Sequence, residues 1–253
     1  MKDDDHMRLL SKMSGSARAM AAAVIGLCVI GGTGFGQTLD IPPALVSLTS
    51  DTGEKLLLES QARQAYWNLS IQFVTQKTQS YCGVASIVMV LNALGSPAPT
   101  TPEYAPYHVF TQDDFFNAET EKVRPQSLIA RRGMTVDQIG GLLAAYAVEA
   151  SVHHAADTDV ATFRQQAMRY LSAKDHYVIV NYLRRSLGQE RGGHISPLAA
   201  YDSQTDRFLI LDVARYKYPP VWVSTSDLFA AMNTPDADND NKSRGFVLVG
   251  ADP

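Results

Sequence analysis

Cysteine is scarce in this sequence of 253 residues, which contains only Cys28 and Cys82. Two isolated cysteines exclude the paired Cys motifs of zinc sites. Lys and Arg number 22 against 26 Asp and Glu, the formal net charge is −4, and no basic stripe is present. This charge balance argues against nucleic acid as a partner. The sequence also lacks internal repeats, and no glycine-rich phosphate loop occurs outside the first 36 residues.

The remaining composition is that of an ordinary globular domain, with 45% hydrophobic and 19% charged residues. The first 36 residues differ from the rest. Basic residues precede an apolar stretch over 19–30, and small residues follow over 31–36. This is the layout of a secretory signal peptide, and the apolar stretch is too short for a comfortable membrane span. We expect cleavage after Gly36, which leaves one domain over 37–253.

Cleavage implies an exported protein, periplasmic or extracellular, without stable membrane insertion. A retained anchor is the alternative. Leu27 is too large beside Cys28 for a lipoprotein signal. Residues 1–6 are typical of an added leader or an early start, because Met7 would begin a more typical signal.

After loss of the signal, Cys82 would be the only cysteine in the protein. It begins an apolar run without charge that ends at Gly95. The spacing of Val84, Ile87, Val88 and Leu91 predicts a helix over 84–94 that is buried on most of its surface. A thiol in the first turn of such a helix meets the positive end of the helix dipole, which lowers the thiol pKa. The pattern therefore favours a reactive cysteine over an inert core residue.

The rest of the chain changes from helical to strand periodicity. Helices are predicted over 54–66, over 135–146, where Thr135 and Gln138 form a capping box, and over 159–172. Strands are predicted over 176–183, 196–202, 207–214, 219–223 and 245–250, with a short helix ending at 232. Segment 103–125 mixes aromatic and acidic residues and permits no assignment. Helices followed by an antiparallel sheet predict an α+β fold with two packed layers around a cleft.

A nucleophilic cysteine needs a base and a group that orients the base. His194 follows two glycines at the start of a predicted strand, and Asp212 lies inside an apolar strand, where an unpaired carboxylate is costly to bury. The turn near 204–205 brings residue 194 roughly opposite 215, so both side chains fall at the same end of the strand pair. Whether they share a face depends on register, because a slip of one residue reverses the answer.

The order Cys82, His194, Asp212 is that of papain-like cysteine enzymes, although the papain signature around the cysteine is absent. Four longer segments carry a closer resemblance. In order, residues 79–94, 192–201, 211–223 and 243–249 resemble the phytochelatin synthase family, over roughly 40–250 of the chain. The resemblance implies a papain-like α+β fold in which a helical layer, with the nucleophile helix, packs on an antiparallel sheet.

The resemblance also implies the family's chemistry. Glutathione loses glycine, and γ-glutamylcysteine is held as a thioester on the cysteine. Water or a second glutathione then accepts the acyl group. We therefore expect a glutathione γ-glutamylcysteinyltransferase that makes short phytochelatins and serves heavy-metal detoxification.

Residue roles follow from the matching motifs. Cys82 is expected to be the nucleophile, His194 the base and later the acid, and Asp212 the group that orients His194. Gln76 is expected to donate to the oxyanion together with the backbone N–H of Cys82. The expected substrate contacts are Arg184, Arg244, Asp236 and Gly193, since arginine forks suit the carboxylates of glutathione. Asp238 or Asp240 could replace Asp236, because about one extra residue precedes Arg244.

The sequence departs from the plant-type pattern, in which a cysteine-rich second domain follows the catalytic domain. No cysteine cluster is present here, so the resemblance favours release of glycine over transfer to a second glutathione. No cofactor is expected for acyl-enzyme formation, and cadmium or zinc would enter as a glutathione thiolate complex. The expected partners are glutathione and γ-glutamyl peptides, and a homodimer is left open.

Two alternatives remain: an exported general cysteine peptidase, and a non-catalytic module that binds thiols or metals. No metal-ligand set is predicted. The acidic segment 236–247 imitates an EF-hand loop but has Asn241 and Val247 where glycine and glutamate are required. The pair His153 and His154, with Asp157, is expected on a solvated turn.

Overall fold

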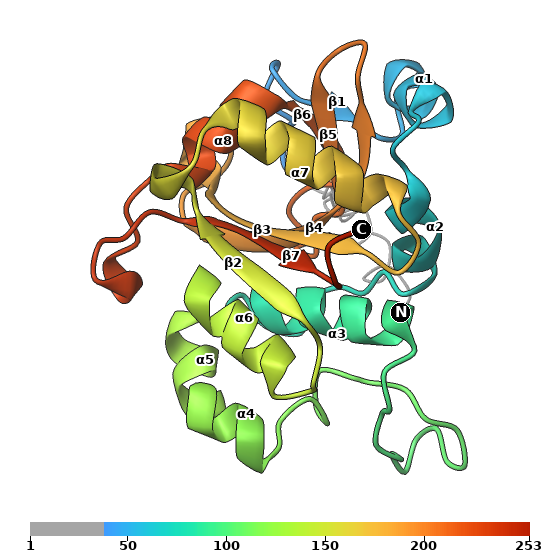
Figure 1. Cartoon of the computed structure of the whole chain (residues 1–253), viewed down its shortest axis with the longest axis vertical. Helices are drawn as coiled ribbons and strands as arrows, with labels where there is room; N and C mark the ends of the chain where they lie inside the picture. The colour runs from blue at the N-terminus through green and yellow to red at the C-terminus, as the bar shows by residue number, and fades with distance from the viewer. Residues whose placement is uncertain (1–37) are drawn as a thin grey trace, which may run out of the picture. The chain divides into compact units, whose positions relative to one another are not determined.

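The computed structural model describes residues 38–253, so the predicted signal peptide over 1–36 lies outside the described residues (Figure 1). One antiparallel sheet runs through this part of the chain, in the order β1-β6-β5-β4-β3-β7-β2. Its strands are β1 (Val46–Ser47), β2 (Ala150–His154), β3 (Tyr177–Leu183), β4 (Gly193–Asp202), β5 (Arg207–Ile210), β6 (Val221–Ser224) and β7 (Gly245–Val249).

Helices lie on both faces of the sheet. They are α1 (Asp51–Glu59), α2 (Gln64–Ile71), α3 (Cys82–Leu94), α4 (Ala118–Val123), α5 (Gln126–Arg132), α6 (Val136–Ala144), α7 (Val160–Ser172) and α8 (Thr225–Met232). Figure 1 shows α3 and α6 on one side of the sheet and α7 and α8 on the other. The α+β prediction is confirmed, but the helices form two layers where the sequence predicted one. None of the described helices is long and apolar enough to cross a membrane.

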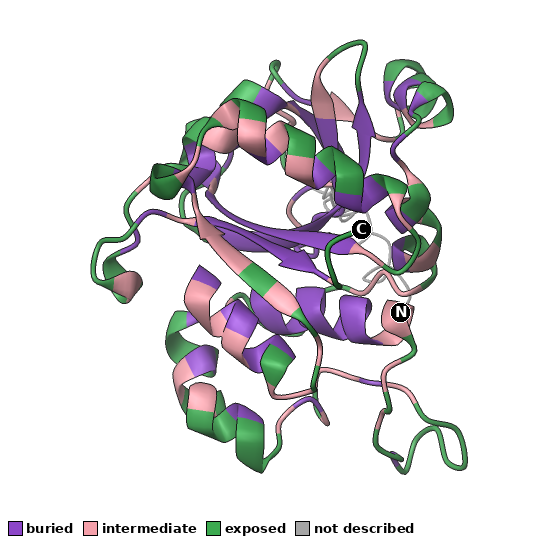
Figure 2. Cartoon of the chain, viewed as in Figure 1, coloured by how far each residue is buried: buried purple, intermediate pink, exposed green. Residues whose placement is uncertain are grey.

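Helix α3 forms the central buried element, as the apolar run predicts. Every residue from Cys82 to Leu91 is buried, and Figure 2 shows the helix almost entirely in the buried colour. Gly95 ends the helix in a left-handed conformation with φ of 67°, which glycine adopts without a steric penalty. The buried helix directs its first turn, with Cys82, at β4.

The helix predicted over 54–66 is instead two helices, α1 and α2. The hydroxyl of Ser60 donates to the carbonyl of Leu56 at 2.7 Å, and the carbonyl of Ala62 accepts the N–H of Tyr201 in β4 at 2.8 Å. The break is therefore fixed by a bond to a strand about 140 residues away, which no local pattern contains.

The short helices α4 and α5 and strand β2 are among the elements that have no counterpart in the sequence prediction. His153 and His154 belong to β2, which pairs with β7, and do not lie on a solvated turn. The ring of His153 stacks on Phe246 with 4.8 Å between centroids. This strand is missed because its pattern is short and only partly buried.

A register shift in the β4–β5 pair decides the face on which Asp212 lies. Asp202 pairs with Arg207, and continuation of that register would set residue 197 opposite 212. Between Leu198 and Ala200 the register shifts by one, so that Leu198 pairs with Ile210. Residue 196 then stands opposite 212. Because directly opposed residues share a face, the bulge brings Asp212 to the face of Ser196 and His194.

The turn of the same hairpin is held by Asp206. Arg164 of α7 donates from Nε and Nη2 to the two carboxylate oxygens at 2.7 and 2.8 Å. The hydroxyls of Tyr201 and Thr225 also donate to this carboxylate, at 2.9 and 2.6 Å. The hydrogen bonds from Arg164 are the main cause that lowers the pKa of Asp206 to about 2.

We expect Asp206→Asn to destabilise the protein in a pH-dependent manner. The folded-state pKa lies below that of the unfolded chain. The carboxylate therefore stabilises the fold fully above the unfolded value and loses this effect as pH falls toward about 2. Urea unfolding of both proteins between about pH 6 and about pH 2.5 should give a gap in unfolding free energy that narrows with acid. A gap that stays constant over this range would contradict the assignment.

Candidate active site

Three side chains from different elements meet beneath the surface. Cys82 is the first residue of α3, His194 lies on β4, and Asp212 follows β5. Nε2 of His194 lies 2.8 Å from Oδ1 of Asp212, and His194 is close enough to the thiol of Cys82 to lower its pKa. Because Asp212 and Ser196 occupy Nε2, Nδ1 is the ring nitrogen left to interact with the thiol. The three residues are 7%, 4% and 0% exposed in that order, so water scarcely screens their charges.

Two serine hydroxyls connect the elements that carry these groups. Ser86, one turn after Cys82, lies 2.8 Å from the Cys82 carbonyl oxygen and 3.2 Å from that of Ile195. It thereby joins the first turn of α3 to the strand beside His194. Ser196 lies 3.0 Å from Nε2 of His194 and accepts the N–H of Val213 at 3.3 Å. The relative positions of thiol, ring and carboxylate are thus fixed by backbone on both sides.

Opposed effects set the ionisation of the thiol. Burial alone would raise the pKa of Cys82, but the hydrogen bond and charge of His194 and the N–H groups of Ile195 and Gly83 lower it overall. Burial likewise opposes a charged ring, yet the charge of Asp212 raises the pKa of His194. Despite burial, the charge and hydrogen bond of His194 lower the pKa of Asp212 to about 2. Both shifts favour a thiolate on Cys82 and a protonated ring on His194 over the neutral pair.

The pair opens into a cavity of about 460 Å³. Of the predicted substrate contacts, Gly193, Asp236 and Arg244 line this cavity with Cys82 and His194. Nη2 of Arg244 lies 3.5 Å from Oδ1 of Asp236. Asp238, predicted as an alternative to Asp236, also lines the wall, whereas Asp240 is not among the lining residues. The structure thus brings most of the predicted set together around the thiol.

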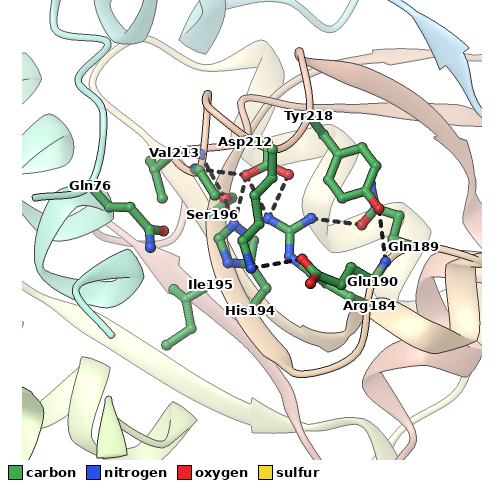
Figure 3. Close-up of polar contacts among 12 residues, drawn as sticks. Gln76, Arg184, Gln189, Glu190, His194, Ile195, Ser196, Asp212, Val213 and Tyr218 are labelled. Carbon is green, nitrogen blue, oxygen red and sulfur yellow. Dashed lines mark hydrogen bonds and ion pairs between the residues drawn. The ribbon is translucent and has the colours of Figure 1, made fainter. Parts of the chain in front are cut away.

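Arg184 lies elsewhere. Its side chain is buried behind Asp212, with Nη2 at 2.8 Å from the carboxylate, and it is not among the residues that line the cavity. Figure 3 shows the guanidinium between Asp212 and Gln189. The substrate contact predicted for Arg184 would require this group to leave the carboxylate, which nothing in its packing favours.

Gln76 lies beside the cluster, and the hydrogen bonds of its side chain go to other residues (Figure 3). Its backbone N–H donates to the Val213 carbonyl at 2.9 Å, which places it next to Asp212 in space. Nε2 donates to the carbonyl of Thr78 at 2.8 Å and to the hydroxyl of Tyr216 at 3.0 Å, and Oε1 is buried without a partner among the described residues. Donation to an oxyanion therefore needs a rotation of this amide, and the predicted role stays a prediction.

Several residues of the cavity wall were not predicted from the sequence. Asn181 of β3 is 2% exposed, lines the cavity, and has no side-chain hydrogen bond among the described residues. A buried polar group without a hydrogen bond costs free energy, so this amide is suited to bond to a molecule in the cavity. Arg131 and Arg132 add two cations at the end of α5, and Arg132 lies 3.8 Å from Asp238. A buried Asn in an apolar strand pattern was the signal that could have indicated this position.

No group of His, Cys, Asp and Glu suited to a metal ion occurs within residues 38–253. His154, one of the histidines weighed above, bonds through its two ring nitrogens to the carbonyl of Ser243 at 2.6 Å and the carboxylate of Asp137 at 2.9 Å. Both nitrogens are occupied by protein groups.

A buried thiol paired with imidazole and carboxylate, open to a polar cavity, defines a protein with an activated cysteine nucleophile. The chain belongs to the phytochelatin synthase family, whose sequence model matches residues 36–246. This confirms the resemblance carried by the four motifs.

Three relatives illustrate the match. Glutathione gamma-glutamylcysteinyltransferase 1 of Lotus japonicus is 33% identical over 218 residues, which are 85% of this chain and 42% of the relative. The protein of the same name in Triticum aestivum is 34% identical with the same coverage of both chains. The glutathione gamma-glutamylcysteinyltransferase of Schizosaccharomyces pombe is 25% identical over 83% of this chain and 50% of its own length. The chain thus spans half or less of the length of these relatives.

We expect iodoacetamide to alkylate Cys82 rapidly at about pH 6, where an ordinary thiol with a pKa of about 8.5 is almost wholly protonated. His194→Gln removes the imidazolium and should return the reaction to the pH dependence of an ordinary thiol. Mass spectrometry of the peptide that contains Cys82 measures the rate without interference from Cys28. Identical pH profiles for both proteins would exclude the thiolate–imidazolium pair.

Proposed function

We propose that this protein is a glutathione gamma-glutamylcysteinyltransferase that works through a thioester on Cys82. The observation that carries the proposal is that Cys82 and His194 line a polar cavity, with Asp212 bonded to His194 behind them, in a member of the phytochelatin synthase family. The names of its relatives, which are glutathione gamma-glutamylcysteinyltransferases, support glutathione as the substrate.

In the first step, the thiolate attacks the carbonyl carbon that joins cysteine to glycine in glutathione. The S–C bond forms and the C–N bond breaks. The imidazolium of His194 gives its proton to the departing amine, so glycine leaves as a neutral amine and γ-glutamylcysteine stays as a thioester. Asp212 keeps the ring turned toward the sulfur. The backbone N–H of Cys82, at the start of α3, lacks a partner within the helix and is suited to the oxyanion.

In the second step, the neutral imidazole accepts a proton from the attacking group. Water yields free γ-glutamylcysteine, and the α-amine of a second glutathione yields a longer γ-glutamyl peptide. Both routes regenerate the thiol. Cadmium or zinc would take part as the thiolate complex of the acceptor, as substrate and not as a resident cofactor.

The charges of the cavity support a γ-glutamyl substrate. Its free α-carboxylate and α-ammonium need a cation and an anion side by side, and Arg244 and Asp236 supply them 3.5 Å apart. An ordinary α-linked peptide has no such pair of free groups within the chain. The buried amide of Asn181 lies in the same wall and can donate to the carboxylate or accept from the ammonium.

We also propose that the fold is papain-like and that the protein is exported. The first part is supported by a thiol at a helix N-terminus and a histidine on the facing strand. The second rests on the pattern of residues 1–36.

The full chain, incubated with glutathione with and without cadmium, should release glycine, and mass spectrometry of the products separates the two routes. γ-Glutamylcysteine alone would mean that water is the acceptor, and peptides with two or more γ-glutamylcysteine units would demonstrate transfer. Cys82→Ser should abolish glycine release because serine lacks a thiolate, whereas Cys28→Ser should not change it.

Glycine release by Cys82→Ser at the wild-type rate would refute the mechanism. Faster cleavage of α-linked peptides than of glutathione would identify a general cysteine peptidase. Tight cadmium or zinc binding without turnover would identify a binding module.

A further inference from the structure

The most unusual group near the site is a second buried cation. Arg184, at the start of the 3₁₀ turn η2 (Arg184–Leu187), is only 3% exposed. Nη2 lies 2.8 Å from the carboxylate of Asp212, and Nη1 donates to Oε1 of Gln189 at 2.8 Å. The guanidinium carbon lies 5.2 Å from the ring centroid of Tyr218. Arginine is almost never buried so deeply unless each of its groups is paired.

The surroundings of Arg184 also shape the approach to His194. Its backbone N–H donates to the carbonyl of Gly192 at 3.0 Å, and its carbonyl accepts the N–H of Gln189 at 3.2 Å. The hydroxyl of Tyr218 accepts the N–H of Glu190 at 2.8 Å. The loop that leads into His194 is therefore built around this arginine (Figure 3).

Asp212 is consequently shared between two cations. Oδ1 accepts from Nε2 of His194, from Nη2 of Arg184 and from the N–H of Ala214, each at 2.8 Å. A carboxylate paired with His194 alone would hold the imidazolium strongly and keep its proton. A second cation draws on the same carboxylate and repels the imidazolium, which makes the proton easier to release.

We propose that Arg184 is a positioning residue that holds Asp212 in place and weakens its hold on protonated His194, so that the imidazolium gives up its proton to the leaving amine. The inference rests on the proposed function for the identity of that amine. It assigns Arg184 a place behind the reacting groups and no contact with substrate.

The ionisable groups that face Arg184 agree with this role. They come from several elements and comprise Asp212, His194, Cys82, Tyr182, Tyr218 and Glu190. The pKa of His194 is raised overall. Burial acts to lower it, the charge of Asp212 raises it, and the charge of Arg184 acts to lower it. The same cation attracts the thiolate of Cys82.

Arg184→Met removes the charge and keeps much of the side-chain volume. Loss of the cation should raise the pH at which the thiolate forms and the pH at which His194 loses its proton. We expect the acidic limb of Cys82 alkylation by iodoacetamide and the alkaline limb of glycine release each to move up by roughly one pH unit. At neutral pH, kcat for glycine release should fall several-fold while KM for glutathione changes little.

Arg185→Met is the matched control, because Arg185 is the exposed neighbour on the same turn. It should leave both limbs in place. Arg184→Lys, which keeps the charge without the fork, should retain the limbs near their wild-type positions and lower kcat. Circular dichroism and thermal unfolding check that each variant folds, and Arg184→Lys serves as the test if Arg184→Met does not fold.

Several results would overturn the proposal. One is an Arg184→Met variant whose two pH limbs match those of the wild type and whose KM for glutathione is raised, which would indicate a substrate contact. Another is an equal shift in Arg185→Met. The proposal would also be contradicted if the pH limbs of Arg184→Lys, which keeps the charge, moved as far as those expected for Arg184→Met. Because alkylation needs no glutathione, failure of the wild type to release glycine would refute the proposed function and leave this test intact.

Discussion

The site depends on one carboxylate that has no exposed surface. Asp212 can remain ionised in the interior only because His194, Arg184 and the N–H of Ala214 all point at it. Those partners come from different parts of the chain, so satisfying this charge fixes the ends of β3, β4 and β5 relative to one another. Asp212 also acts on the thiol of Cys82, through His194. The fold and the chemistry therefore depend on the same carboxylate.

Much of this arrangement could be predicted from sequence. The apolar run after Cys82 required a buried helix, and Asp212 within an apolar strand required a partner. From these two local patterns, the energetics of burial was enough to predict a nucleophile and an orienting acid. The mixed fold followed from the change of periodicity along the chain, and the family followed from four motifs in order.

What escaped prediction depends on contacts between distant residues. The bulge between Leu198 and Ala200 decides the face on which Asp212 lies, and no turn motif in the sequence predicts this bulge. Arg184 and Arg185 are adjacent arginines that the sequence does not distinguish, and only the fold shows that the first is buried and the second exposed. Gln76 and Asn181 show what a motif can and cannot give. The motif identified Gln76, whose amide donates to Thr78 and Tyr216 in the structure, and it overlooked Asn181, which lines the cavity.

The distance along the chain between the reacting groups has a further consequence. Cys82 meets His194 only after α3 has docked on β4, and His194 meets Asp212 only after the β4–β5 pair has closed with its bulge. A chain that is still being made or is still unfolded therefore carries Cys82 as an ordinary, mostly protonated thiol. Reactivity appears together with the completed tertiary structure. The thiol is therefore unreactive during synthesis, and its reactivity indicates that folding is complete.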